Sequence, residues 1–340
     1  MKRLLIFSLG IYYNNQIFFQ INLAFPSFCS KLNMESWGFM SDNNTDLYPD
    51  LNLEDIIKIL EKKDSDRLNN AVYSADGVDV VCDFSYKDDG DFYHNFDIYY
   101  KNPKSENLPT VIMIHGGGLV YGTKELNKQM GIYLAKFGFN VVNISYRLLP
   151  SVTLKKQIKD VCDAFSYFYE NSYKLNLNAD KIFLVSDSAG SFLTLAAFAL
   201  MKDKNFRKIF NLSARNIDIS AMAFISPMTH LLESGSLSLI NEPARCGLND
   251  EEKSFTDNIL KAFESINLPS SIVITSKEDF IRDQAKSLKN FLEKRDVKNI
   301  FLDFKKTDDY PLGHGFPVSH PDLAESRFVL SEISDFFNSF

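Results

Sequence analysis

One apolar run in this chain breaks at a serine and resumes at once with helical character. Residues 182–185 read Ile-Phe-Leu-Val, the segment Ser186-Asp-Ser188-Ala-Gly190 follows, and apolar helical sequence continues to Leu200. A serine between small residues, where a strand turns sharply into a helix, exposes its hydroxyl as in a G-x-S-x-G nucleophile elbow. The pattern therefore predicts that Ser188 is a nucleophile at the end of a buried strand.

A glycine-rich loop follows another apolar run earlier in the chain. Residues 111–114 read Val-Ile-Met-Ile, and the next four residues are His115, Gly116, Gly117 and Gly118. A loop of this kind turns backbone N–H groups toward negative charge that develops on a substrate oxygen. Together with the serine elbow, this loop favours a serine hydrolase.

We expect the backbone N–H groups of Gly117, Gly118 and Ala189 to bind that oxyanion. Consecutive glycines let the main chain approach a substrate without obstruction by side chains. The residue after the nucleophile lies in the first turn of the helix, where its N–H group has no partner within the helix.

A serine hydroxyl needs a base that an acid holds in one orientation. Five histidines are present, and His314 lies in a turn-rich loop after the last predicted strand. That is the position of the base when the chain order is serine, acid, histidine. His115 belongs to the glycine loop, and His94, His230 and His320 have no matching context. We predict that His314 is the base.

The acid should follow the penultimate strand, predicted at 271–275. Three acidic residues lie in the next stretch: Glu278, Asp279 and Asp283. Asp279 is the best candidate, and the other two remain alternatives. Asp283 opens the next predicted helix, where Asp is common as an N-cap.

Length, charge and cysteine content limit the classes of function. A chain of 340 residues suits one large α/β domain with additions, or two small domains. A net charge of −7 argues against nucleic acid or an anionic membrane as the main partner. The four cysteines are widely spaced and have no histidine at ligand spacing, so neither a zinc site nor a disulfide framework is indicated. We expect no metal and no organic cofactor.

The amino end is ambiguous. Met1-Lys-Arg and the apolar residues 4–11 resemble the start of a signal peptide, but polar residues break the run and no Ala-x-Ala site follows. Whether residues 1–33 are a signal peptide stays open, and we favour a cytoplasmic protein over a secreted one. The body of the chain has no apolar run long enough for a transmembrane helix, so stable membrane insertion is not expected.

The remaining periodicities predict the architecture. Apolar spacing predicts a short helix at 53–63, and two strand-like segments around the turn Asp88-Asp-Gly90 suggest an antiparallel pair. From residue 110 strands and helices alternate, which predicts a mostly parallel central sheet with helices on both faces. Further strands are expected at 139–145, 181–185, 219–225 and 299–304, and helices at 125–137, 153–173, 189–202, 255–265, 284–294 and 322–338.

We therefore expect an N-terminal segment with cap helices at 1–70 and a catalytic domain at 71–340. The polar interval 229–265 interrupts the strand–helix alternation and is expected to complete a small helical cap over the site.

These motifs resemble the hormone-sensitive-lipase-like esterase branch of the α/β-hydrolase family. The matching segments keep the order of the family: His115-Gly-Gly-Gly, Ser145-Tyr-Arg-Leu-Leu-Pro, Ser186-Asp-Ser-Ala-Gly, Asp279-Phe-Ile-Arg-Asp and His314-Gly-Phe. The resemblance runs from about residue 72 to the end of the chain. It implies a carboxylesterase with Ser188, Asp279 and His314 as its triad and Gly117, Gly118 and Ala189 as its oxyanion hole.

Two residues depart from the pattern of that family. Ser186 stands where the elbow usually begins with glycine, and Ser145 stands where Asp usually precedes Tyr-Arg. Neither change removes a catalytic group.

The leading hypothesis is a serine esterase for small-molecule esters with short to medium acyl chains. Charged residues in both cap candidates argue against an interfacial triglyceride lipase. An amidase or peptidase on the same triad and a non-catalytic binding protein on this fold remain alternatives. The sequence leaves acyl length, leaving group and oligomeric state open.

Overall fold

The structure is a computed structural model that describes residues 52–71, 73–231, 242–307, 310 and 312–340. The signal-like start at 1–33 lies outside the described residues. The same holds for the remainder of the segment up to residue 51 and for residues 232–241 of the predicted cap insertion.

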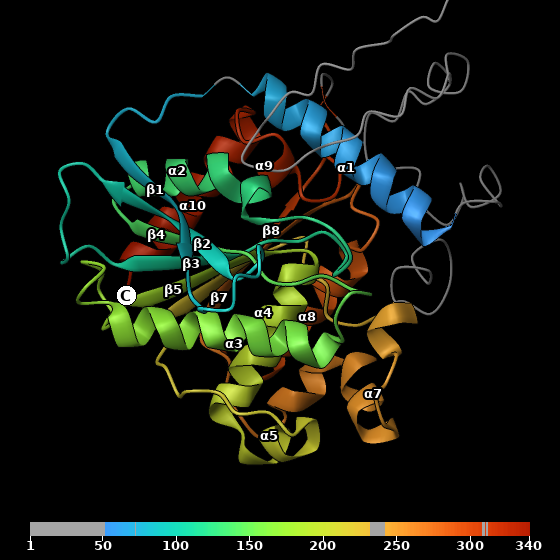
Figure 1. Cartoon of the computed structure of the whole chain (residues 1–340). Helices are drawn as coiled ribbons and strands as arrows, with labels where there is room; N and C mark the ends of the chain where they lie inside the picture. The colour runs from blue at the N-terminus through green and yellow to red at the C-terminus, as the bar shows by residue number, and fades with distance from the viewer. Residues whose placement is uncertain (1–51, 72, 232–241, 308–309, 311) are drawn as a thin grey trace, which may run out of the picture. The chain divides into compact units, whose positions relative to one another are not determined.

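An eight-stranded sheet runs through the molecule in the order β1-β2-β4-β3-β5-β6-β7-β8 (Figure 1). Its strands are β1 (Val78–Ser85), β2 (Asn95–Lys101), β3 (Thr110–Ile114), β4 (Asn140–Ile144), β5 (Ile182–Asp187), β6 (Ala221–Ile225), β7 (Ser270–Ser276) and β8 (Asn299–Phe304). The pairs β1–β2 and β2–β4 are antiparallel, and all other pairs are parallel. The predicted antiparallel start and mostly parallel sheet are thus confirmed.

Helices cover both faces of this sheet (Figure 1). The α-helices are α1 (Leu53–Asn70), α2 (Lys128–Lys136), α3 (Leu154–Asn171), α4 (Ala189–Lys202), α5 (Lys204–Phe210), α7 (Asp250–Thr256), α8 (Arg282–Lys294), α9 (Phe316–Ser319) and α10 (Ala324–Asn338). Two 3₁₀ helices are η4 (Lys124–Asn127) and η5 (Ile259–Phe263). Residues of α3, α4 and α8 form one hydrophobic core, and residues of α2 and α10 form a second one on the other face.

Four helical segments differ from the sequence prediction. The first helix continues past residue 63 to Asn70, where the pairs Lys62–Asp66 and Asp64–Arg67 stabilise its polar last turns. The helix predicted at 255–265 is instead α7 followed by η5, because Asn249 forms a capping box with Glu252 and starts the helix earlier. The prediction missed α5, a helix of seven residues, and the short helix α9 after His314.

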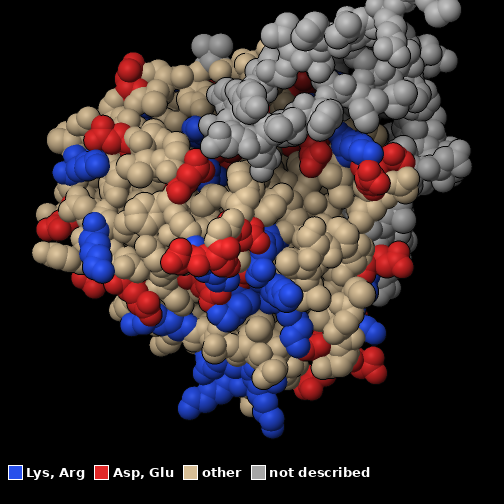
Figure 2. Space-filling model, in the orientation of Figure 1, with Lys and Arg blue, Asp and Glu red and all other residues tan. Residues whose placement is uncertain are grey.

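Charged groups of both signs lie next to one another over much of the surface that Figure 2 shows.

One cluster joins the first two strands to α3: Asp160, fully buried, accepts hydrogen bonds from Lys87 and from two side-chain nitrogens of Arg147. His94 also contacts this carboxylate, with Nε2 3.0 Å from Oδ1. This histidine therefore belongs to a structural ion cluster. Of the helices in the described ranges, none is both long enough and apolar enough to cross a bilayer.

Candidate active site

Ser188 lies between β5 and α4 in a backbone conformation that few residues adopt. Its φ of 46° and ψ of −121° fall outside the ordinary helical and extended regions. Its N–H group donates to the Ile225 carbonyl of the neighbouring strand at 2.9 Å, which ties the turn to the sheet. A strained turn of this kind persists because the sheet and helix on either side fix it.

Close packing behind the turn explains why glycine occupies position 190. A Cβ there would lie 2.3 Å from the carbonyl oxygen of Ile114 and 2.5 Å from that of His115. At position 186, by contrast, a side chain fits. The Ser186 hydroxyl donates to the Ser191 hydroxyl at 3.2 Å, so the departure from glycine leaves no buried hydroxyl without a partner.

His314 joins the serine to an acidic residue. Its Nε2 lies 2.8 Å from Ser188 Oγ, and its Nδ1 lies 2.7 Å from Asp279 Oδ1. With the Nδ1 proton on the carboxylate side, Nε2 can accept the serine proton. An isolated bridge between Glu278 and Gly313 holds the two loops side by side. The structure thus brings together the three residues that the sequence singled out.

Of the three candidate acids, Asp279 is the one that contacts His314. It is buried and also accepts hydrogen bonds from Thr275 Oγ1 at 2.9 Å and from the Ile281 N–H group at 3.0 Å. Burial alone would raise the pKa of this carboxyl, but the charge and hydrogen bond of His314, with hydrogen bonds from Ser226 and Ile281, lower it. Glu278 is exposed, and Asp283 is exposed and pairs with Lys286.

The glycine loop follows β3 and turns back toward the serine. Gly117 and Gly118 have φ values of 110° and 61°, in the region that favours glycine. A Cβ on Gly117 would lie 2.1 Å from the Tyr121 carbonyl oxygen, so a side chain is excluded there. Gly117 lines the same cavity as Ser188, and Ala189 is the first residue of α4. Their roles as oxyanion donors, and that of Gly118, remain predictions.

His115 is held in a fixed position at the start of this loop. Its ring is fully buried and stacks on Tyr146, with ring centroids 4.2 Å apart, and Tyr146 Oη donates to the His115 carbonyl at 2.7 Å. Burial lowers the pKa of His115 to about 4, although the Gly116 carbonyl that its Nδ1 contacts at 2.7 Å opposes the shift. His115 is therefore neutral at pH 7 and has a structural role.

Ser145 also has a structural role at this edge of the sheet. Its hydroxyl accepts a hydrogen bond from the Lys124 N–H group at 3.0 Å, and its carbonyl accepts one from Tyr86 Oη at 3.0 Å. The serine therefore anchors the start of η4, which leads toward Asn127.

Asp187 is a site residue that sequence reasoning missed. Its carboxylate is buried beside the nucleophile, lines the same cavity, and accepts a hydrogen bond from Asn127 Nδ2 at 2.8 Å. Burial raises its pKa from 3.8 to about 6, although Asn127, His314 and the Gly116 backbone oppose the shift. A Cβ on Gly116 would lie 2.4 Å from Asp187 Oδ2, so this carboxylate packs directly against the glycine loop.

The cavity at Ser188 is small, about 40 Å³. A single water needs roughly 10–15 Å³ of such volume, so a few heavy atoms fill it. Besides the residues already described, its walls are made by Asp64, Arg67, Tyr121, Leu126, Gly315, Val318 and Ser319.

Helix α1 therefore contributes to a site more than a hundred residues away in the sequence. Arg67 donates to Asp64 on its own helix at 3.0 Å and to the Val318 carbonyl at 3.3 Å. Tyr121 Oη donates to Asp64 at 2.9 Å, which ties α1 to the glycine loop.

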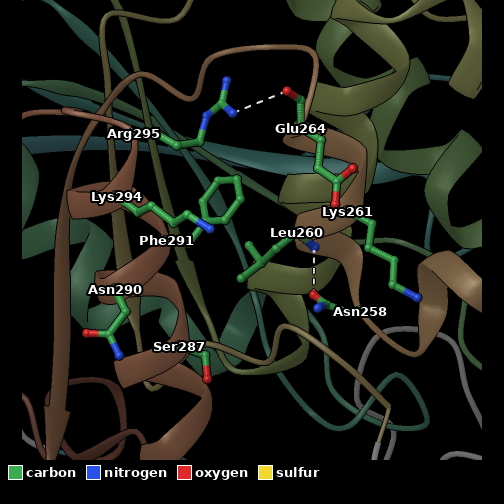
Figure 3. A pocket seen from close by; sticks show the side chains of 9 residues that line it. All are labelled: Asn258, Leu260, Lys261, Glu264, Ser287, Asn290, Phe291, Lys294 and Arg295. Carbon is green, nitrogen blue, oxygen red and sulfur yellow. Dashed lines mark hydrogen bonds between the residues drawn. The ribbon is translucent and has the colours of Figure 1, made fainter.

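A larger cavity of about 560 Å³ lies elsewhere, between η5 and α8 (Figure 3). Its lining residues are Asn258, Leu260, Lys261, Glu264, Ser287, Asn290, Phe291, Lys294 and Arg295. Arg295 already donates to the Glu264 carbonyl at 3.2 Å. This cavity holds neither the serine nor the histidine described above.

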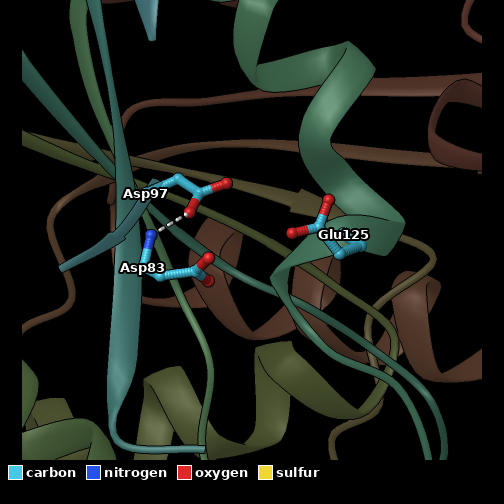
Figure 4. Close-up of side chains that lie close together, drawn as sticks. All are labelled: Asp83, Asp97 and Glu125. Atoms are coloured by element: carbon cyan, nitrogen blue, oxygen red, sulfur yellow. Dashed lines mark hydrogen bonds between the residues drawn. The ribbon is translucent and has the colours of Figure 1, made fainter. Parts of the chain in front are cut away.

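Within the described residues, one acidic group has the spacing of a metal site: Asp83, Asp97 and Glu125 (Figure 4). The Lys124 ammonium group already lies among them, at 2.9 Å from Asp83 and Asp97 and 2.7 Å from Glu125. The lysine supplies positive charge to the three carboxylates, of which only Asp97 is buried, so this cluster is a partly exposed ion network.

Comparison with known proteins shows which family this chain belongs to. The family described as BD-FAE matches residues 96–279, more than half of the chain. The chain belongs to the BD-FAE family. An acetyl esterase of Salmonella paratyphi B is 31% identical over 107 residues, which are 31% of this chain and 33% of that protein. The chain thus spans about a third of the length of the curated relatives that it matches, including a 30% identical acetyl esterase of Salmonella typhi.

Solved structures show how far the fold of this BD-FAE member is shared. Esterase B from Lactobacillus rhamnosis aligns with a TM-score of 0.76 at 24% identity, over 83% of this chain and 92% of that one. A hyperthermophilic esterase from Pyrobaculum calidifontis aligns with a TM-score of 0.64 at 23% identity, over 86% and 92% of the two chains. The resemblance to hormone-sensitive-lipase-like α/β-hydrolases is confirmed at the level of family and fold.

If Asp279 orients the base, its replacement should impair hydrolysis far more than replacement of its neighbour. Asp279→Asn should lower kcat by about 10⁴-fold, because an amide in that position leaves His314 in the wrong tautomer. Asp283→Asn is the matched control and should stay within a few-fold of the parent. Steady-state hydrolysis of a chromogenic ester measures both, and the reverse ranking would move the acid to Asp283.

The raised pKa of Asp187 predicts a dependence of stability on pH. Its carboxyl favours the folded state most below pH 3.8, and that contribution is lost as the pH rises through about 6. Asp187→Asn cannot ionise. Its free energy of unfolding relative to the parent should therefore rise between pH 4 and pH 7, by about 2 kcal/mol.

Urea unfolding at a series of pH values measures this difference. Asp283→Asn is the control that should show no such rise, because a hydrogen bond from Lys286 lowers the pKa of Asp283. If the difference in free energy of unfolding between Asp187→Asn and the parent stayed constant with pH, Asp187 would have the same pKa in the folded and the unfolded chain.

Proposed function

We propose that this protein is a serine carboxylesterase that cleaves small esters with short acyl chains. The observation that carries the proposal is the continuous hydrogen-bonded relay from Ser188 through His314 to Asp279, with distances of 2.8 and 2.7 Å. The similarity to acetyl esterases supports the same reaction class.

In the proposed reaction Ser188 Oγ attacks the ester carbonyl while His314 Nε2 takes its proton. The charge that forms on the carbonyl oxygen is stabilised by the N–H groups of Gly117, Gly118 and Ala189. His314 then protonates the departing alcohol, and a water molecule, activated by the same nitrogen, hydrolyses the acyl-enzyme. Asp279 stabilises the imidazolium in both halves of the reaction.

The preference for short acyl chains rests on the walls of the cavity. Arg67 and Asp64 of α1 close it with a polar surface, and Tyr121 lies against them. A long apolar acyl chain would bind weakly beside this polar wall, because it would displace the water that hydrates Arg67 and Asp64.

We also propose the division into a catalytic domain at 71–340 and a cap. Helix α1 supplies Asp64 and Arg67 to the walls of the cavity at Ser188. The interval 229–265 adds α7, which α3 holds through the ion pair of Lys155 with buried Glu252 at 2.6 Å.

An acyl-chain series of soluble chromogenic esters, run in the presence of a chelator, tests the proposed function. The parent should hydrolyse esters with two to four acyl carbons faster than decanoyl esters. Ser188→Ala should lose about 10⁴-fold or more in kcat while its Tm stays unchanged. Arg67→Ala should raise kcat/KM for hexanoyl relative to acetyl esters. Lys62→Ala, on the exposed face of the same helix, should not.

Three results would contradict this account. Full activity in Ser188→Ala would exclude that serine as the nucleophile. A rate that jumps when a long-chain triglyceride exceeds its solubility limit would indicate an interfacial lipase. Cleavage of amides in preference to the matched esters would favour an amidase.

A further inference from the structure

The end of β6 and the residues that follow it contact Ser188, Asp279 and the residue next to His314, although sequence reasoning assigned them no role. Ile225 accepts the hydrogen bond from the Ser188 N–H group at 2.9 Å, and the Met228 N–H group donates to the Ser188 carbonyl at 3.1 Å. These two bonds clamp the nucleophile turn from one side.

Ser226 connects the same segment to Asp279 and to the loop that carries His314. Its hydroxyl hydrogen-bonds the Asp279 carboxylate, and its Oγ accepts a hydrogen bond from the Gly315 N–H group at 2.9 Å. A serine hydroxyl has one proton to donate and two lone pairs, so both bonds are satisfied at once. The hydroxyl thus links the acid to the residue next to His314.

The backbone of Ser226 is strained. Its φ of 47° lies in the left-handed region, where glycine is favoured, yet the side chain is 1% exposed and cannot be serving solubility. Its N–H group donates to the Ile274 carbonyl at 2.7 Å, which holds the strained residue against β7. Glycine would adopt this conformation with less strain, so a need for the hydroxyl explains why serine occupies the position.

We propose that Ser226 is a positioning residue that fixes Asp279 and the His314 loop relative to each other, so that Nε2 stays aimed at Ser188. The inference rests on the proposed function, because it concerns the geometry of that relay. Ser226 itself does not touch the reacting atoms.

Two variants of Ser226 test this proposal. Ser226→Ala removes the hydroxyl and keeps the backbone strain, whereas Ser226→Gly removes the hydroxyl and relieves the strain. Both should lower kcat for a short-chain ester by about 10- to 100-fold with KM within two-fold of the parent, since misplaced catalytic groups slow the chemical step. The Tm of Ser226→Gly should equal or exceed that of Ser226→Ala, so its loss of activity cannot be a loss of folding.

Ser271→Ala is the matched control. Ser271 is equally buried and donates to the Pro269 carbonyl at 2.8 Å, but it lies at the opposite end of β7. It should keep the kcat of the parent.

A folded Ser226→Gly protein with the kcat of the parent would overturn the proposal. So would a loss confined to KM, or an equal loss in Ser271→Ala. If the parent itself hydrolysed no ester, the proposed function would fail, and this result is distinguishable because it needs no variant.

Discussion

The site depends on the two hydrogen bonds of the His314 imidazole, because they join side chains from three separate loops. Its two nitrogens contact Ser188 after β5 and Asp279 after β7, while the histidine itself follows β8. Those strands run parallel, so their carboxyl ends meet at one edge of the sheet. The spacing of the strands thus sets the distances at which the three side chains can meet.

Two buried carboxylates at this edge differ in the sign of their pKa shift. Asp279 lies against His314 and accepts several hydrogen bonds, and these interactions lower its pKa against the effect of burial. Asp187 lies beside the nucleophile, and there burial dominates, so its pKa is raised to about 6. Environments that separate two carboxylates in this way let one stay ionised beside a histidine while the other packs against a backbone.

The sequence was sufficient to predict the residues that stand at strand ends. Ser188, Asp279 and His314 each follow an apolar run, and the alternation of strands and helices indicates a common edge. It could not single out Arg67 and Ser226, because their roles arise from contacts between segments far apart in the chain. No spacing rule connects α1 to the loop after β8, and a serine after a strand is unremarkable until its φ and its partners are known.

The most direct measurement of the central claim is the mass of the intact protein after reaction with a fluorophosphonate, followed by mapping of the modified peptide. This reagent reports a serine that a neighbouring base has activated. The account predicts a single covalent addition, carried by Ser188 and absent from Ser188→Ala. An unmodified protein, or an addition carried by a different residue, would contradict it.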